Sequence, residues 1–154
     1  MNEIQWKNIL ICLAHSPPSE CLRQQDIDSI FENMKYVPNN VSGRQTVWEH
    51  TLEVVDKMAE TTTEPVKLFA ALVHDVGKSN TPPELIPHHY GHSERGVKIL
   101  DSMFIDNSTI KEYHKLAHDV ILYHMRIHGI LEIRQPFKLY GLVAIPYKSG
   151  INSN

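Results

Sequence analysis

The hydrophobic residues of this chain recur mainly at intervals of three and four, which is the period of an amphipathic α-helix. The pattern is clearest over residues 46–60, where His50 falls on the apolar face and is expected to point toward the core. A second helix is predicted from Pro65, a residue favoured in the first helical turn, to about Asp75, with Gly77 as its stop. The last turn of this helix therefore carries a histidine and an aspartate in sequence.

Weaker helical patterns occupy most of the remaining chain. Residues 78–91 are an exception, because three prolines and the lack of any period predict a long loop, and such loops are usually functional. The final helix has an apolar stripe that leads to His124. No segment alternates like a strand between turn signals, so we expect an all-α fold, a bundle of about five to seven helices. The other predicted helices cover residues 3–14, a short stretch from 19, residues 26–34, residues 91–104 and a segment from 108 or 109.

The composition is that of an ordinary globular protein, with 42% hydrophobic and 21% charged residues. No apolar run approaches the roughly 18 residues of a membrane span. A formal charge of −3 gives no general attraction to phosphate backbones, so any contact with RNA would be local and weak. Cys12 and Cys21 form no close-spaced pair, and no basic segment followed by an apolar one begins the chain. These features predict a cytoplasmic protein with free thiols.

Histidine is unusually frequent, with ten copies, and it both ligates metals and transfers protons near neutral pH. Five candidate ligands are predicted at inward positions or helix ends of four different helices, and helical bundles build metal sites from such converging side chains. Nitrogen and carboxylate ligands without thiolate favour iron, manganese, nickel, cobalt, zinc or magnesium. The candidates are His50, His74, Asp75, His92 and His124.

Each candidate also has a simpler interpretation. A single inward histidine, such as His50 or His124, is more often a hydrogen-bonded core residue than a ligand. A second His-Asp pair occurs at His118, but its aspartate, Asp119, is turned away from the apolar stripe, so the dipeptide alone is weak evidence. The remaining histidines are expected in loops or at the surface: His15, His88, His89, His114, His118 and His128.

The sequence around the first His-Asp pair, His74 and Asp75, strengthens the hypothesis of a metal site. Residues 48–52 (WEHTL) and 70–78 (AALVHDVGK) resemble the first histidine and the signature helix of the HD metal-dependent phosphohydrolases. Residues 81–96 (TPPELIPHHYGHSERG) are similar to the HD region of bacterial tRNA nucleotidyltransferases, the CCA-adding enzymes. The resemblance covers about residues 6–135. It implies a single HD domain over residues 1–154, with preceding helices in 1–45, the HD core in 46–135 and an atypical tail in 136–154.

This resemblance implies a hydrolase that removes phosphate or opens 2′,3′-cyclic phosphates, acting on a small phosphorylated substrate such as a nucleotide. A divalent metal held by His50, His74 and Asp75 would activate a water, which Asp75 would also orient. Lys78 would bind phosphate oxygens as charge builds in the transition state. The alternative for Lys78 is a cation that the helix C-terminus favours.

A second group of residues extends this prediction. His92, His124 and Arg95 are candidates for a second metal position or for binding phosphate. The alternative for Arg95 is a solvated helix residue. Met125, directly after His124, argues against a second ion, because methionine is a poor ligand for a hard cation.

Two departures from the family pattern limit what the resemblance implies. The catalytic head of the nucleotidyltransferases does not occur in this chain, so we do not expect it to add CCA by itself. The HD pattern also ends with an aspartate on a late helix, and none of the later aspartates, Asp101, Asp106 and Asp119, matches it. The alternative function is therefore an HD remnant that binds a nucleotide or a protein partner. A missing ligand or a lost helix would also favour a homo-oligomer.

Overall fold

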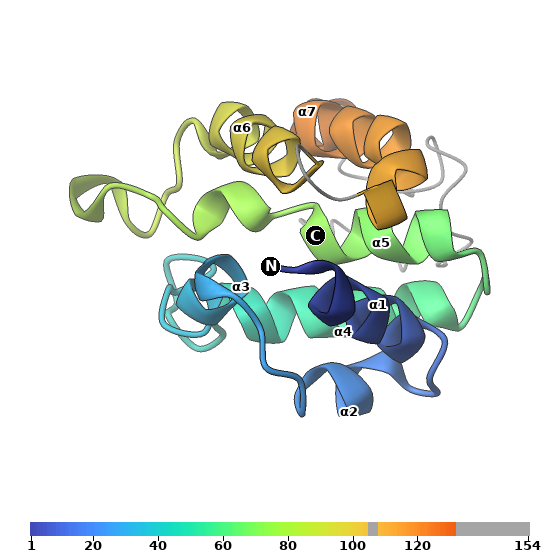
Figure 1. Ribbon diagram of the computed structural model, residues 1–154. Helices are drawn as coiled ribbons and strands as arrows, with labels where there is room; N and C mark the ends of the chain where they lie inside the picture. Colours follow the sequence, from blue (N-terminus) through green and yellow to red (C-terminus); the bar gives the residue numbers. More distant parts are fainter. Residues whose placement is uncertain (105–107, 132–154) are drawn as a thin grey trace.

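The described part of the chain is entirely helical (Figure 1). This computed structural model describes the backbone of residues 1–104 and 108–131, and the side chains of residues 1–104 and 110–124. Within these ranges there is no strand, and an isolated bridge joins Pro38 to Thr46. The elements are α1 (Glu3–Leu13), α2 (Pro18–Leu22), α3 (Ser29–Met34), α4 (Val47–Ala59), α5 (Pro65–Val73), η1 (Val76–Lys78), η2 (Pro83–Leu85), α6 (His92–Phe104), η3 (Ser108–Tyr113) and α7 (His114–Leu131). The prediction of an all-α bundle is confirmed.

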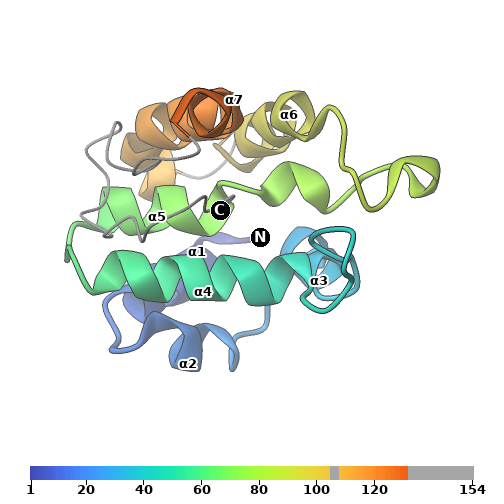
Figure 2. The same cartoon turned by 180° about the vertical axis from the view of Figure 1, so that it is seen from behind.

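Helix α5 lies at the centre of the bundle. It packs against α4 on one side and α7 on the other, and α6 lies beside α7 (Figure 2). Every residue from 68 to 73 is buried, as expected for a helix that is apolar around its whole circumference. The chain that leaves the end of α5 therefore starts from the interior, and the next two residues, His74 and Asp75, are 1% and 2% exposed.

The start of α4 is fixed by a capping box. The Thr46 hydroxyl accepts a hydrogen bond from the Glu49 amide at 3.1 Å, and the Glu49 carboxylate accepts one from the Thr46 amide at 2.9 Å. The helix therefore begins at Val47, close to the predicted residue 46. This register places His50 in the first turn, where it is buried as predicted, with its ring next to that of His74 at the end of α5.

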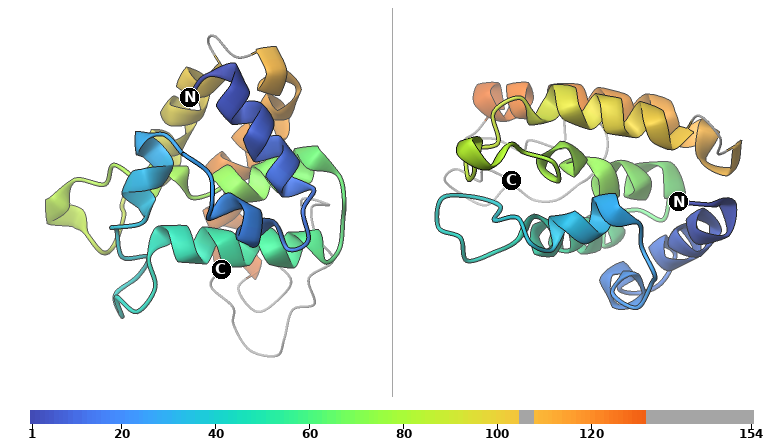
Figure 3. Two further views of the ribbon diagram at one scale, coloured as in Figure 1. Left: turned by 60° about the horizontal axis from the view of Figure 1, so that its bottom comes forward. Right: turned by 60° about the vertical axis from the view of Figure 1, so that its left-hand side comes forward.

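The backbones of η1 and α6 approach each other closely at two glycines. A Cβ atom built on Gly77 would lie far inside van der Waals contact with the carbonyl oxygen of His92, and 2.6 Å from the amide nitrogen of Gly96. A Cβ on Gly96 would lie 2.8 Å from Ile121 of α7. Small residues at these positions let α6 and α7 form one layer directly over α5 and η1 (Figure 3).

The end of α5 differs from the prediction. The helix ends at Val73 rather than near Asp75, because Asp75 leaves the helical conformation at φ −111° and ψ 19°. Gly77 lies in the turn η1 and does not adopt a left-handed conformation, so its role is the close approach to α6 and not that of a helix stop.

Smaller differences concern the helix boundaries near prolines and turns. Helix α2 starts one residue before the expected Ser19, and α3 starts at Ser29 rather than near Asp26, because Asp28 caps it by accepting the Ile30 amide at 2.8 Å. The last predicted helix begins as the 3₁₀ segment η3 and becomes α-helical at His114. Its predicted stripe is confirmed, since the following residues are buried: Ile110, Tyr113, Ala117, Val120 and His124.

The two cysteines are not free thiols, and that prediction is wrong. Cys12 and Cys21 form a disulfide between α1 and α2, with their Cα atoms 5.1 Å apart. The sequence did not indicate this pair, because the two helices fold back on each other across an intervening turn that brings cysteines nine positions apart together. A cytoplasmic location stays a prediction, and a disulfide does not favour it.

Some predictions fall outside the described residues. These are the tail at 136–154, the side chains of Met125 and His128, and the residues around Asp106. None of the helices in the described ranges has the length and apolar content needed to cross a membrane.

We expect Gly77→Ala to destabilise the protein by about 1–3 kcal/mol, the usual cost of inserting a methyl group where no space exists. The added Cβ would push against the backbone of α6, which cannot rotate away as a side chain can. Urea unfolding measures the change. Gly43→Asn serves as the control, since that exposed position has nothing within 4 Å of an added Cβ and asparagine tolerates its φ of +65°. A variant as stable as the parent protein would contradict the packing described here.

Candidate metal centre

Four imidazoles surround the carboxylate of Asp75. His50 comes from α4, His74 from the end of α5, His92 from the first turn of α6 and His124 from α7. All five side chains are buried. The structure therefore brings together the five residues that the sequence predicted as ligands, from four helices far apart in the chain.

The two oxygens of Asp75 face different histidines. Oδ2 lies 3.6 Å from His50 Nε2 and 3.1 Å from His74 Nε2. Oδ1 lies 3.7 Å from His92 Nε2 and 3.3 Å from His124 Nε2. Within each of these two groups the potential ligand atoms all lie within 4.8 Å of one another. The geometry thus offers two adjacent positions for a cation, with Asp75 common to both.

Backbone carbonyls fix the orientation of three of these imidazoles. The Nδ1 atom lies 2.7 Å from the Ala71 carbonyl oxygen in His74, 3.2 Å from the His89 oxygen in His92, and 3.0 Å from the Val120 oxygen in His124. A carbonyl can only accept, so each Nδ1 carries a proton and donates it. The Nε2 atom of each ring is then turned toward Asp75. Metal-bound histidines are usually held by such a hydrogen bond from their other nitrogen.

The His92 and Asp75 atoms that face each other lack a hydrogen bond. Burial lowers the pKa of His92 to about 4, although the Asp75 charge opposes this, so the ring is neutral at pH 7. With its proton on Nδ1, His92 presents a lone pair on Nε2. This atom and Asp75 Oδ1 are buried, and neither has a hydrogen bond of good geometry in the described structure. Two acceptors that face each other in this way are stabilised by a cation between them, and their donor type fits a divalent metal.

His50 and Asp75 have the protonation states that ligands need. Burial lowers the pKa of His50 to about 4, with the Asp75 charge opposing the shift. Burial would raise the pKa of Asp75, but the charges of His74 and Lys78 and the close approach of the His124 and His74 imidazoles outweigh it, so this pKa lies well below its ordinary value. At pH 7 the centre thus holds an ionised carboxylate and, at His50 and His92, neutral imidazoles.

Lys78 lies beside the centre. Its Nζ atom is 3.4 Å from Asp75 Oδ2 and donates a hydrogen bond to Asn39 Oδ1 at 3.1 Å. The ammonium group therefore balances part of the charge of the buried carboxylate. Its predicted contact with phosphate oxygens stays a prediction.

Arg95 points its guanidinium group at the loop before α6. It donates hydrogen bonds to the carbonyl oxygens of Gly77 at 3.2 Å and Tyr90 at 2.6 Å, and to the Thr81 hydroxyl at 3.0 Å. It is therefore not a freely solvated helix residue. These three bonds use three of its five N–H donors within the protein, and phosphate binding by Arg95 stays a prediction.

His89 is the functional candidate that the sequence did not reveal. It was expected in a loop or at the surface, yet its side chain is 2% exposed, while its neighbour His88 is exposed and stacks on Tyr90. The loop has no hydrophobic period, so no signal in the sequence separates the two histidines. The second His-Asp pair behaves as expected, because Asp119 is partly exposed and pairs with Lys115 at 3.2 Å.

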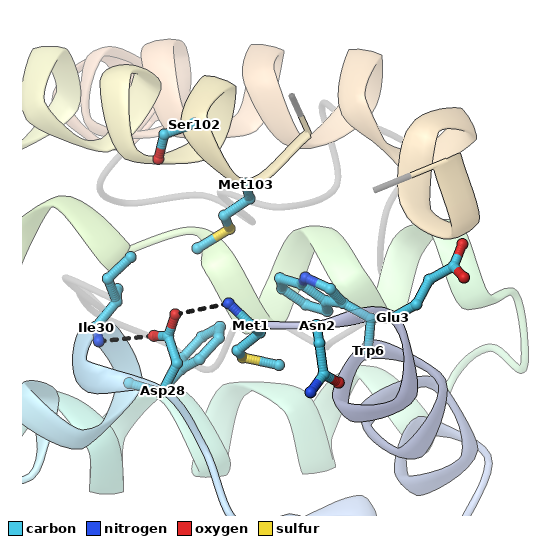
Figure 4. Close-up of a pocket in the computed structure, with 9 residues that line it drawn as sticks. Met1, Asn2, Glu3, Trp6, Asp28, Ile30, Ser102 and Met103 are labelled. Carbon is cyan, nitrogen blue, oxygen red and sulfur yellow. Dashed lines mark hydrogen bonds and ion pairs between the residues drawn. The ribbon is translucent and has the colours of Figure 1, made fainter. Parts of the chain in front are cut away.

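A cavity of about 450 Å³ lies elsewhere, between the N-terminal segment, α3 and α6 (Figure 4). Two of the charged groups that line it form an ion pair, since the Met1 ammonium group and the Asp28 carboxylate are 3.1 Å apart. The indole nitrogen of Trp6 is buried there without a hydrogen-bond partner in the described structure. No histidine or cysteine lines this cavity, and the metal-binding chemistry therefore belongs to the Asp75 centre.

Comparison with known protein families gives one match that spans most of this architecture. The HD domain model matches residues 47–145, which include every residue of the Asp75 centre. The chain belongs to the HD domain family. Its buried cluster of histidines and an aspartate is typical of HD domains, and so is the capacity of such a cluster to hold a metal.

The HD domain of this chain is similar to that of several curated bacterial proteins. Multifunctional CCA proteins of Nitrosococcus oceani and Methylococcus capsulatus are each 41% identical over 85 residues, which is 55% of this chain. The protein of that name from Legionella pneumophila strain Lens is 38% identical over 111 residues, or 71% of this chain. The matched regions cover only 20% to 26% of these relatives. The comparison with solved structures gave no match.

The low pKa values of His50 and His92 predict that the metal-free protein loses stability in mild acid. Between pH 6.5 and about 4 the unfolded chain binds protons at these residues and the folded chain does not, so stability falls as the pH falls. Each buried imidazole should contribute about 3 kcal/mol to this loss. Asp75 contributes only below its ordinary pKa of 3.8, outside this window.

Urea unfolding in the presence of a chelator, at about pH 7 and about pH 4.5, measures the loss. His50→Gln removes one titrating group, so its stability should depend less steeply on pH, whatever its stability at pH 7. His15→Gln, at an exposed position, should retain the full dependence. An equal slope for His50→Gln and the parent protein would contradict the assigned protonation state.

Proposed function

We propose that this HD domain is a metal-dependent phosphohydrolase that acts on nucleotides or other small phosphoesters, including 2′,3′-cyclic phosphates. The observation that carries this proposal is the pair of buried, unbonded acceptors, His92 Nε2 and Asp75 Oδ1, inside a ring of four histidines. A structural core histidine would be expected to have a hydrogen bond at this position. The arrangement is instead that of a site prepared for a cation.

The residues that would hold the metal form two groups. His50, His74 and Asp75 would hold one ion, and Asp75 with His92 and His124 would hold a second. The candidates remain iron, manganese, nickel, cobalt, zinc and magnesium, since all accept nitrogen and oxygen ligands. When bound, a divalent ion of this type lowers the pKa of a coordinated water and polarises a phosphoryl oxygen.

The chain's own side chains would supply positioning and charge. Asp75, ionised at pH 7, is able to accept a hydrogen bond from the attacking water and so orient it toward phosphorus. Lys78 would stabilise negative charge on the phosphate with its ammonium group, which has three N–H donors and lies close to Asn39 and Asp75. The backbone bonds to His74, His92 and His124 would hold the imidazoles in place throughout, which avoids the cost of reorganisation.

The substrate class rests on the similarity to multifunctional CCA proteins, whose HD regions this chain resembles. That similarity supports a nucleotide or another small phosphoester as substrate. A net charge of −3 supports a small substrate over a long nucleic acid. Because the chain spans about a fifth to a quarter of these relatives, no activity of their other parts is proposed for it.

A second candidate function is supported by the sequence beyond Asp119. No aspartate follows that residue, so the late aspartate of the HD pattern is missing, and Met125 follows His124. An HD remnant that binds a nucleotide or a protein partner without turnover would have these features. The two candidates differ in a measurable way, because only the hydrolase turns over phosphoesters.

The proposed activity predicts that His74→Ala and Asp75→Ala each lower turnover by more than about 100-fold, since each removes a metal ligand. Hydrolysis of bis(p-nitrophenyl) phosphate and of 2′,3′-cyclic AMP, with manganese, nickel, cobalt or magnesium added, provides the assay. Metal bound per chain is measured in parallel. The matched controls are His118→Ala and Asp119→Ala, the partly exposed second pair, which lies outside the Asp75 centre and should retain activity. A parent protein with neither bound metal nor turnover under any of these metals would support the non-catalytic module.

We also propose that the protein forms a homo-oligomer, in which a second chain covers core surface or supplies a ligand in place of the missing aspartate. Light scattering of the purified protein should then give a mass that is a multiple of 17.7 kDa. A monodisperse monomer across the micromolar range would contradict this.

A further inference from the structure

The side chain of His89 connects the two loops at the edge of the metal centre. Its Nε2 atom lies 2.7 Å from the carbonyl oxygen of Pro38, in the segment that leads into α4. Its Nδ1 atom lies 2.6 Å from the hydroxyl of Thr81, in the segment that leads toward α6. The Nε2 atom donates its proton to the Pro38 oxygen, which can only accept. The Thr81 hydroxyl, which also lies 3.0 Å from the Lys78 carbonyl oxygen, is the second hydrogen-bond partner of the ring.

Arg95 also bonds to Thr81, the partner of His89 Nδ1. Its guanidinium group donates to the Thr81 hydroxyl at 3.0 Å and to the backbone of Gly77 and Tyr90. Residues 77–90 are therefore tied at three points to one side chain of α6. The His89 ring lies between Thr81 and Pro38, and it cannot rotate without breaking its hydrogen bonds to both.

The backbone of His89 in turn orients His92. His89 has a positive φ of 56°, an uncommon conformation for a residue with a side chain. In this conformation its carbonyl oxygen accepts two hydrogen bonds from His92, one from the amide at 3.0 Å and one from Nδ1 at 3.2 Å. The second bond places the proton on Nδ1 and turns Nε2 toward Asp75 Oδ1. The conformation of His89 therefore sets the ligand atom that His92 presents.

We propose that His89 is a positioning residue for the second metal position of the centre. It does not contact the metal or the substrate. Its ring, fixed by Pro38 and Thr81, holds its own carbonyl against His92, and this carbonyl keeps Nε2 of His92 free of a proton and aimed at Asp75. The metal part of this inference rests on the proposed function, whereas the orientation of His92 is a property of the metal-free protein as well.

His89→Asn is the informative variant. Asparagine adopts a positive φ more readily than most residues, so the backbone conformation itself is not strained, but its short side chain cannot bridge Thr81 and Pro38 together. Thr81→Val removes the hydroxyl with little change in shape. Thr81→Ser keeps the hydroxyl and should behave like the parent protein. His88→Ala is the matched control, because this adjacent histidine is exposed.

The first measurement is the tautomer of His92 in the metal-free protein, read from long-range ¹H–¹⁵N spectra of the histidine rings and assigned with His92→Gln. The parent protein, Thr81→Ser and His88→Ala should show one form, with the proton on Nδ1. His89→Asn and Thr81→Val should show exchange between the two forms. A parent-like spectrum for His89→Asn would overturn the inference, and this result does not depend on whether any metal binds.

The second measurement is the number of manganese ions bound per chain and their affinity. We expect His89→Asn to weaken the affinity for the second ion by at least tenfold and to leave the affinity for the first ion unchanged. His92→Ala should have the same effect. Two ions bound by His89→Asn with parental affinity would also overturn the inference. A parent protein that binds no manganese but shows the predicted tautomers would reject the second metal position, and with it the proposed function, while the orientation of His92 by His89 would stand.

Discussion

The ionised carboxylate of Asp75 is the group on which this structure depends. A charge in the protein interior is costly unless other groups compensate it, and Asp75 is 2% exposed. Its position follows from α5, whose apolar circumference places the helix at the centre of the bundle, so that the residues after its end cannot reach solvent. The rest of the bundle compensates this charge. Four helices each contribute one histidine, and Lys78 contributes an ammonium group at 3.4 Å.

These compensating groups are arranged unequally around the two oxygens. Lys78 lies on the Oδ2 side with His50 and His74, whereas Oδ1 faces only His92 and His124 among the described ionisable groups. On the Oδ1 side the neutral His92 presents a lone pair and therefore donates no hydrogen bond to the carboxylate. This supports a cation at the position that the sequence, in which Met125 follows His124, made the less convincing of the two.

The fold and the candidate ligands could be predicted from the sequence because each depends on a local pattern. The helical spacing of apolar residues predicted α4, α5 and α7 and placed His50 and His124 on inward faces. The sequence around His74 and Asp75 resembles that of a known family. The structure of residues 78–91 could not be predicted in this way. That segment lacks a hydrophobic period, and its conformation depends on distant partners, such as Pro38 for His89 and Arg95 for Thr81. The disulfide of Cys12 and Cys21 was missed because it depends on how α1 and α2 pack.

We propose that the Asp75 carboxylate holds two adjacent cations. Anomalous X-ray diffraction from crystals grown with manganese is the decisive measurement, since the signal locates the metal without reference to activity. We expect two peaks, one between Asp75, His50 and His74 and the other between Asp75, His92 and His124. An absence of anomalous signal around Asp75, with the imidazoles bonded only to the carboxylate and to one another, would contradict it.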